Sequence, residues 1–169
     1  MIPLITHSME DKKYSVEELV KAYMAGLVDG CGTFGVRIAS VDDYDVGYSV
    51  SVAFRFRNTR EAVMADFSGW AEDQGLSVKI KKSSTVQIAK LDDIETLIDI
   101  LRPFVRSKQI DMDILSEEII PRIKNDEHLN EDGLIELMAY VEQLPSYDVS
   151  KRTYTQDYFI EEFKTDTAQ

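Results

Sequence analysis

The sequence predicts an α+β fold in which helices cover one face of an antiparallel sheet. Three observations support this prediction: a helical period of apolar residues near the N-terminus, two pairs of segments in which apolar and polar residues alternate, and helical segments between and after these pairs. The resulting order is helix, strand, strand, helix, strand, strand, helix, with additional helices behind. A chain of 169 residues can bury such a core as one domain.

The first helix is expected to begin after Ser15 and to run to about Asp29. Ser15 and Glu18 have the spacing of a capping box, in which each side chain accepts a hydrogen bond from the backbone of the other. Apolar residues at helical spacing would form its core-facing side: Val16, Leu19, Val20, Tyr23, Met24 and Leu27. A second stripe of small residues is made of Ala22, Gly26 and Gly30. Because glycine inside a helix costs about 1 kcal/mol relative to alanine, this stripe predicts the close approach of another backbone.

The strands are predicted from side chains that alternate with a period of two. Phe34, Val36 and Ile38 alternate with Thr33, Gly35, Arg37 and Ala39, and a second alternation over 48–57 follows a turn-rich segment. These two strands should form an antiparallel hairpin. A helix at about 59–73, shorter strands at 76–81 and 85–89, and helices at 91–100, from Pro103 onward and at 134–144 complete the order. Residues 1–13 are expected to form a flexible leader, 14–145 the domain, and 146–169 an acidic, polar tail of uncertain order.

The chain is acidic, with 31 acidic residues against 19 basic ones and a formal net charge of -12. The acids are nevertheless missing from the face of the sheet that the helices would leave open. That face collects basic and hydrogen-bonding residues, namely Thr33, Arg37, Ser49, Ser51, Arg55, Arg57, Lys79, Lys81, Thr85 and Gln87, with Lys82 in the adjoining turn. A β-ribbon can enter the major groove, so this face is predicted to bind double-stranded DNA. The alternative is a polar face that meets only solvent.

The segment 23–34 then carries a recognisable motif. Residues Met24, Ala25, Gly26, Leu27, Val28, Asp29, Gly30, Cys31 and Gly32 resemble the nine positions of the LAGLIDADG motif of homing endonucleases, and 101–109 resembles a second segment of the single-motif members. The resemblance covers about 14–144 and implies an αββαββα order with a saddle-shaped, four-stranded sheet. It also implies a homodimer on a roughly palindromic DNA site, in which Ala22, Ala25, Gly26, Asp29 and Gly30 belong to the dimer interface.

The resemblance also bears on catalysis. Family nucleases hold divalent metal ions with an acid at the eighth motif position, and here that position is Cys31. Magnesium prefers hard oxygen ligands, so Cys31 should hold Mg²⁺ poorly, and Asp29 is a weak substitute as a metal ligand. Lys108 matches a family lysine near the scissile phosphate, and Asn58 stands where a glutamine commonly orders water.

The sequence therefore predicts a sequence-specific DNA-binding protein that is deficient in cleavage. One alternative is an active, Mg²⁺-dependent endonuclease, and another is a protein-interaction module that uses the acidic helices. A thiolate site built on Cys31 with His7 or His128 is not favoured, because both histidines are expected to be solvated. The single cysteine fits a reducing cytoplasm, and no apolar run approaches the roughly 20 residues of a membrane span.

Overall fold

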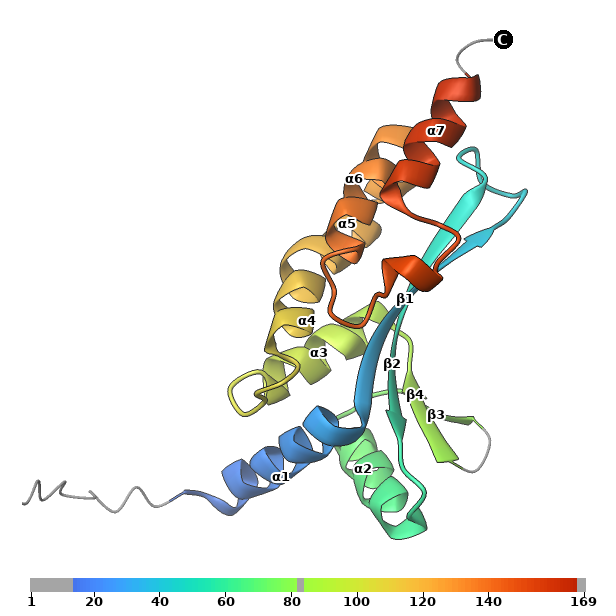
Figure 1. Ribbon diagram of the computed structural model, residues 1–169. Coiled ribbons are helices and arrows are strands. Elements are labelled where there is room, and N and C mark those ends of the chain that lie inside the picture. Colours follow the sequence, from blue (N-terminus) through green and yellow to red (C-terminus); the bar gives the residue numbers. More distant parts are fainter. Residues whose placement is uncertain (1–13, 82–83, 167–169) are drawn as a thin grey trace, which may run out of the picture.

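The computed structural model describes residues 14–81 and 84–166, with side chains described through Lys164 (Figure 1). The predictions made for the leader 1–13, for His7 and for Lys82 lie outside the described residues. Within the described ranges, no helix has both the length and the apolar character needed to cross a membrane.

The sheet has four antiparallel strands in the order β1-β2-β4-β3, as the sequence predicts. Strand β1 (Gly32–Ser40) pairs along its whole length with β2 (Tyr48–Arg57), whereas β4 (Thr85–Ile88) pairs only with the last part of β2 and carries β3 (Val78–Lys81) at the edge. The sheet is therefore four strands wide near the start of β1 and narrows to a two-stranded ribbon toward the β1–β2 turn (Figure 1).

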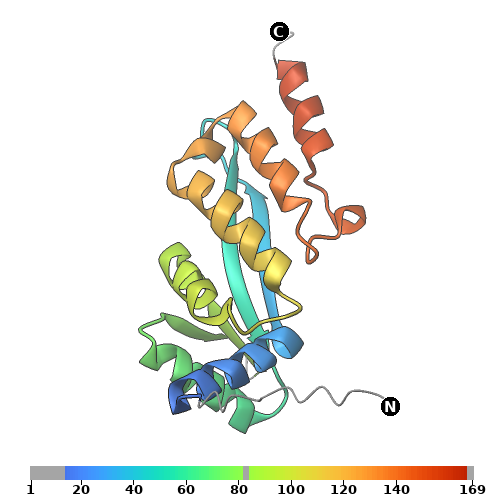
Figure 2. The same ribbon diagram turned by 90° about the vertical axis from the view of Figure 1, so that its left-hand side faces the viewer.

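The inner face of the sheet packs against helices, and the alternation along the strands determines which residues are buried. Phe34, Phe54 and Phe56 are at most 1% exposed. Phe67 of helix α2 (Glu61–Asp73) stacks on Phe56, with the ring centroids 4.2 Å apart, and α3 (Leu91–Leu101) contributes four fully buried side chains to the same core. The helices gather on this face of the long hairpin (Figures 1 and 2).

Helix α1 (Val16–Cys31) begins with the predicted capping box: Ser15 Oγ accepts from the Glu18 N–H at 3.1 Å, and Glu18 accepts from the Ser15 N–H at 2.8 Å. Its predicted core face is confirmed only toward the C-terminal end, where Met24 is buried and Leu27 packs against the core. Val16 is 79% exposed, and the residues that are buried are Met24, Ala25 and Val28 near the C-terminal end. The N-terminal half of α1 projects beyond the core, so its apolar side chains remain open on the surface.

The helix expected from Pro103 begins later, at Gln109. Residues 102–104 form a turn, and the chain then enters a continuous helical stretch of α4 (Gln109–Ile114), the π-helical η2 (Leu115–Ile119) and α5 (Ile120–Lys124). Pro121 has no N–H to donate to the carbonyl of Glu117. The pattern of backbone hydrogen bonds in the helix is therefore irregular at this point.

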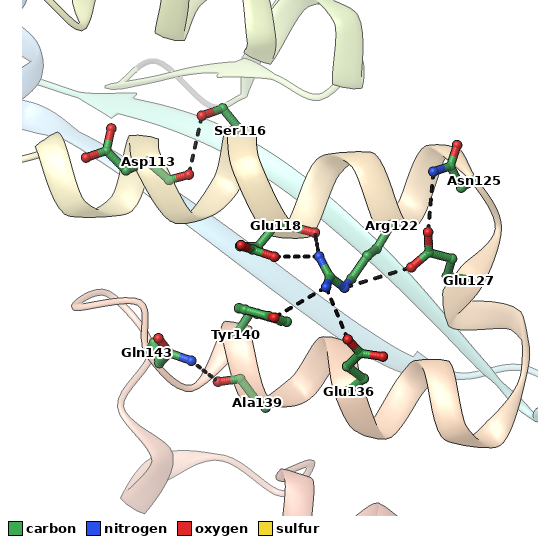
Figure 3. A network of polar contacts seen from close by, with 10 residues as sticks. All are labelled: Asp113, Ser116, Glu118, Arg122, Asn125, Glu127, Glu136, Ala139, Tyr140 and Gln143. Atoms are coloured by element: carbon green, nitrogen blue, oxygen red, sulfur yellow. Dashed lines mark hydrogen bonds and ion pairs between the residues drawn. The ribbon is translucent and has the colours of Figure 1, made fainter.

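Helix α5 is joined to α6 (Glu131–Val141) through Arg122, which lies at the centre of a polar network (Figure 3). The guanidinium contacts Glu118 at 2.6 Å and Glu136 at 3.1 Å, and it lies over the Tyr140 ring at 4.4 Å. Because Arg122 is partly buried, these ion pairs are screened less than pairs on the open surface. Several acids of the C-terminal half are thus neutralised within the chain.

The segment from Ser146 onward was expected to be a polar tail, and this expectation is wrong for most of it. After the short helix η4 (Val149–Lys151), helix α7 (Gln156–Asp166) packs on the hairpin and on α6. Tyr48 of β2 meets the ring of Phe159 edge-on, with centroids 4.9 Å apart, and Phe159 is fully buried. Tyr154, Tyr158 and Phe163 complete the cluster. Spaced aromatic residues thus bury a segment whose composition is acidic.

His128 is a further correction, since it is only 7% exposed rather than solvated. It lies in the short helix η3 (Glu127–Leu129), just before α6. Burial lowers the pKa of His128 below its usual value of 6.5, although the charge of Asp126 and a hydrogen bond to the Arg122 backbone act in the opposite direction. Buried and neutral, His128 resists protonation that the unfolded chain accepts.

We therefore expect the free energy of unfolding to decrease as the pH is lowered through 6.5, with a slope of up to about 1.4 kcal/mol per pH unit from His128. The unfolded chain binds the proton at its ordinary pKa, whereas folded His128 does not, so acidification favours unfolding. Denaturant titrations between pH 7.5 and 5.5 measure the slope. His128→Gln should flatten it, and an equal slope in wild type and His128→Gln would contradict the assignment.

Candidate functional site

The open face of the sheet brings the predicted polar residues into rows that run across the strands. One row contains Lys79, Gln87, Arg55 and Thr33, and the adjoining row contains Lys81, Thr85 and Arg57. The four lysine and arginine side chains of these rows are exposed, and none of the four strands contains an acidic residue. The register thus confirms that these residues share one face. The sequence predicts this because every second residue of a strand points to the same side of the sheet.

Toward the hairpin turn the same face becomes less charged. Arg37 pairs with Ser51, and Ala39 pairs with Ser49. The serine hydroxyls make long contacts of 3.4 to 3.5 Å with carbonyl groups of β1, so they are only weakly held and can donate to another group. The basic character of the face is therefore concentrated in its wide part, near the C-terminal end of α1.

Two basic residues beside this face were missed at the sequence level, namely Lys151 and Arg152. With Arg37 and the neighbouring residues of β1 they line a cavity of about 370 Å³ at the free edge of the sheet. The Arg152 guanidinium lies 4.9 Å from the centroid of the Tyr147 ring, which orients it. The sequence signal that could have identified them is the adjacency of two basic residues in an otherwise acidic C-terminal segment.

The structure brings Cys31 and Asn58 together at the end of α1. Cys31 is the last residue of the helix, and Asn58 directly follows β2. Asn58 Nδ2 donates to Cys31 Sγ at 3.3 Å, while Asn58 Oδ1 accepts from the Arg60 N–H at 2.8 Å. The amide is thus held at both ends. The predicted neighbourhood of Cys31 and Asn58 is therefore present, with a sulfur atom at its centre.

Asp29 connects this end of α1 to the loop before α4. Its carboxylate accepts from the N–H groups of Arg106 at 2.8 Å and Ser107 at 2.9 Å, and from the Ser107 hydroxyl at 2.9 Å. The Lys108 N–H makes a longer contact of 3.3 Å, which holds Lys108 near the motif. Partial burial raises the pKa of Asp29, but the hydrogen bonds outweigh it and leave the pKa below its usual value.

These contacts weigh against Asp29 as a metal ligand, because both of its carboxylate oxygens already accept hydrogen bonds from the chain. No group of three or more histidine, cysteine, aspartate and glutamate residues within 14–81 and 84–166 is arranged to hold a metal ion. The remaining candidate, Cys31, offers sulfur, and Mg²⁺ prefers oxygen in near-octahedral geometry. Of the two motif candidates, therefore, Cys31 offers a poor ligand for Mg²⁺ and Asp29 offers oxygens that are already engaged within the described chain.

The small-residue stripe of α1 lies on the surface. A Cβ atom added at Gly26 or Gly30 would meet nothing within 4 Å, so no contact inside the described chain requires these glycines. Exposed apolar side chains lie beside the stripe: Tyr14, Val16, Leu19, Val20 and Tyr23. Ala25, in contrast, is completely buried in its own chain and is not available to a partner, which corrects its assignment to the dimer interface.

The sequence matches no protein-family model and no curated protein. The structure, however, has the fold of the LAGLIDADG homing endonucleases. It is similar to I-CvuI, solved in complex with the I-CreI target in the presence of Mg with the DNA not cleaved, at a TM-score of 0.71 and 22% identity over 88% of this chain and 95% of that chain. It is also similar to I-Vdi141I, an archaeal intron-encoded homing endonuclease complexed with DNA. Here the TM-score is 0.73 and the identity is 20%, over 90% of this chain and 99% of that chain.

A third comparison bears on the number of motifs. I-LtrWI, a LAGLIDADG homing endonuclease bound to target DNA, gives a TM-score of 0.64 and 23% identity over 76% of this chain but only 45% of that chain. Nearly complete coverage of I-CvuI and I-Vdi141I, and half coverage of I-LtrWI, agree with the single motif found in this sequence. The resemblance indicated by 24–32 is thus confirmed for the fold.

Proposed function

We propose that this protein is a homodimeric, sequence-specific DNA-binding protein that cleaves its target feebly or not at all. The observation that carries the proposal is the acid-free open face of the sheet, which presents Arg55, Arg57, Lys79 and Lys81 from adjoining strands. In a chain with a net charge of -12, an acid-free face of this size is unexpected unless the face has an anionic ligand. The similar structures I-CvuI and I-Vdi141I were solved with DNA.

The chemistry of the face suits the major groove of DNA. Arginine and lysine donate to guanine O6 and N7, and glutamine forms a bidentate pair with adenine, so Arg55, Arg57 and Gln87 can discriminate bases. Lys151 and Arg152 lie beyond the edge of β1, where they suit phosphate groups rather than bases. The combination gives both base discrimination and a salt-dependent affinity.

Dimer formation is supported by α1. A helix with several exposed apolar residues on one side and exposed Gly26 and Gly30 beside them has a surface that a second copy of the helix can cover closely. A twofold dimer of this kind would put two sheets side by side and bind a roughly palindromic site.

The dimer is tested by Gly26→Leu, which places a bulky side chain on the surface of α1. We expect the variant to sediment as a monomer at micromolar concentration while wild type sediments as a dimer. Leucine also has the higher helix propensity, so loss of folding is not expected. Gly69→Leu is the matched control, because Gly69 is likewise an exposed helical glycine with nothing within 4 Å of a Cβ atom. A monomeric wild type, or a dimeric Gly26→Leu, would contradict the proposal.

DNA binding is tested by replacing Arg55, Arg57, Lys79 and Lys81 with serine. Removing one phosphate contact should flatten the dependence of log K on log salt by about one unit, and removing one base contact should cost about 1–3 kcal/mol at one position. A target selected from a random DNA pool serves for the titrations. Lys164→Ser on α7 is the control for the loss of one positive charge away from the sheet, and its effect on affinity is compared with that of Lys79→Ser. Unchanged affinity and slope in the fourfold variant would rule out the sheet as the DNA surface.

Weak cleavage follows from the identity of residue 31. A sulfur atom stands where the resemblance to the LAGLIDADG nucleases implies an acid. Asn58 donates to this sulfur and is shorter than the glutamine that the resemblance implies at its position. If the protein cleaves DNA, Mg²⁺ is the cofactor we expect. Phosphodiester hydrolysis of this kind uses the metal to stabilise attacking and leaving oxygens, a role that cysteine cannot support in place of a carboxylate.

We therefore expect wild type to bind its target without cutting it in Mg²⁺, and Cys31→Asp to gain measurable nicking or double-strand cleavage at the bound site. The gain is limited by geometry, since a misplacement of about 1 Å can cost two orders of magnitude in rate. Cys31→Asn supplies a control of similar size without the charge. The assay follows supercoiled plasmid that carries the selected site, in Mg²⁺ and in Mn²⁺. Efficient, site-specific cutting by wild type would refute the assignment of weak activity.

A further inference from the structure

One row of the open face carries no polar side chain. Gly35 pairs with Ala53, between the row that contains Thr33 and Arg55 and the row that contains Arg37 and Ser51. Neither Gly35 nor Ala53 extends beyond a methyl group, although both lie on the same face as the basic residues. The row is therefore a gap in the layer of side chains.

The gap is filled from the neighbouring row. The atom nearest to where a Cβ atom of Gly35 would stand is Nη1 of Arg55, at 3.1 Å, and the next is the Ala53 carbonyl oxygen at 3.9 Å. The guanidinium of Arg55 thus reaches diagonally across the hairpin and lies over Gly35. Ala53 lies on the open face of the sheet, yet its side chain is only 7% exposed. Neighbouring side chains therefore cover most of Ala53.

The backbone does not explain why residue 35 is a glycine. Gly47 and Gly75 have positive φ, whereas Gly35 does not and pairs regularly within β1. Glycine inside a strand weakens the strand and commonly marks a place where another group approaches closely. Here the approaching group is the Arg55 guanidinium, which would have to give way by a few tenths of an ångström if a Cβ atom were present.

Electrostatics favours the same arrangement. Arg55 belongs to the part of the face that also carries Arg57, Lys79 and Lys81, and like charges that face one another across strands are destabilising. By reaching over the uncharged Gly35–Ala53 pair, the guanidinium moves away from Arg57, Lys79 and Lys81, although it moves toward the row that contains Arg37.

We propose that Gly35 is a specificity-determining residue: its missing side chain lets Arg55 contact a guanine opposite the Gly35–Ala53 row instead of a base opposite its own row. This inference rests on the proposed DNA-binding function. Rows two residues apart along a strand are about 7 Å apart, which is about two base pairs of B-DNA. The guanine is thereby displaced by about two base pairs away from the α1 end of the half-site.

The test is Gly35→Val, which fills the gap with a side chain that favours strands. A random-pool selection with wild type defines the half-site, and competition binding at fixed salt then compares DNAs that differ at a single pair. Arg55→Gln identifies the pair that Arg55 contacts, and this pair should lie where the displaced row places it. We expect Gly35→Val to reduce the guanine preference at that same pair by about 5- to 150-fold, the range given by a bidentate arginine contact.

The double variant Gly35→Val/Arg55→Gln separates a positioning role from a general one. If Gly35 acts through Arg55, the double variant should have no weaker guanine preference than Arg55→Gln alone. Ala39→Val is the matched control, since Ala39 lies on the same strand and face but pairs with Ser49; it should leave this pair unchanged. Should Gly35→Val fail to fold, Gly35→Ala adds the single atom that meets Nη1, and we expect a smaller reduction at the same pair.

Fully additive effects, or an intact guanine preference in a folded Gly35→Val, would overturn the inference. The contact itself is tested without DNA by nuclear Overhauser effects between the Gly35 Hα atoms and the Arg55 side chain in the full chain, and their absence would also overturn it. A wild type that shows these effects but binds no DNA would instead refute the proposed function. The two failures are therefore distinguishable.

Discussion

The hydrogen bonds of the Asp29 carboxylate to the loop 106–108 hold together the parts on which the rest of the structure depends. They join the last turn of α1 to the start of α4, at the place where β1 leaves the helix. The motif helix, the sheet and the C-terminal helices consequently have one fixed relation to one another. Cys31, Asn58 and Lys108 come from three separate segments. The junction holds Lys108 near the end of the motif helix, and the pairing of Gly32 with Phe56 brings Asn58 to Cys31. The half-buried motif acid thus joins α1 to the loop before α4 through hydrogen bonds.

The sheet could be predicted because a period of two allows only one assignment of faces, and strands such as 48–57 alternate without interruption. The exposed side of α1 could not be predicted in the same way. Apolar periodicity shows which residues of a helix avoid water but not whether the covering surface belongs to the same chain, so Val16 and Leu19 were assigned to a core that they do not reach. The family resemblance placed Cys31 and Asn58 in one pocket but did not predict the contact between them. Arg152 was missed because its position beside the sheet depends on where the chain returns to β1 before α7.

The distribution of charge reconciles an acidic chain with a basic working face. The acids of the C-terminal half lie on the helical side, and those around Arg122 and Lys124 are held in ion pairs. Such pairs reduce the number of acids available to an external partner, which weighs against the helices as the main interaction surface. The remaining negative charge would repel a polyanion from the helical side and favour its approach to the open face of the sheet, as the proposed function requires. Acidity and DNA binding are therefore compatible.

The aromatic cluster around Tyr48 has a consequence for how such a protein changes over time. A two-stranded ribbon that extends past its sheet is strongly twisted and only marginally stable by itself. Here it is braced by Phe159 and the rings beside it, which come from the far end of the chain. In a protein that binds DNA as proposed, substitutions in α7 would touch no base but would alter the curvature of the ribbon and hence the outermost bases that it contacts. On the proposed function, the recognition of distant bases would thus change through a helix that itself contacts no DNA.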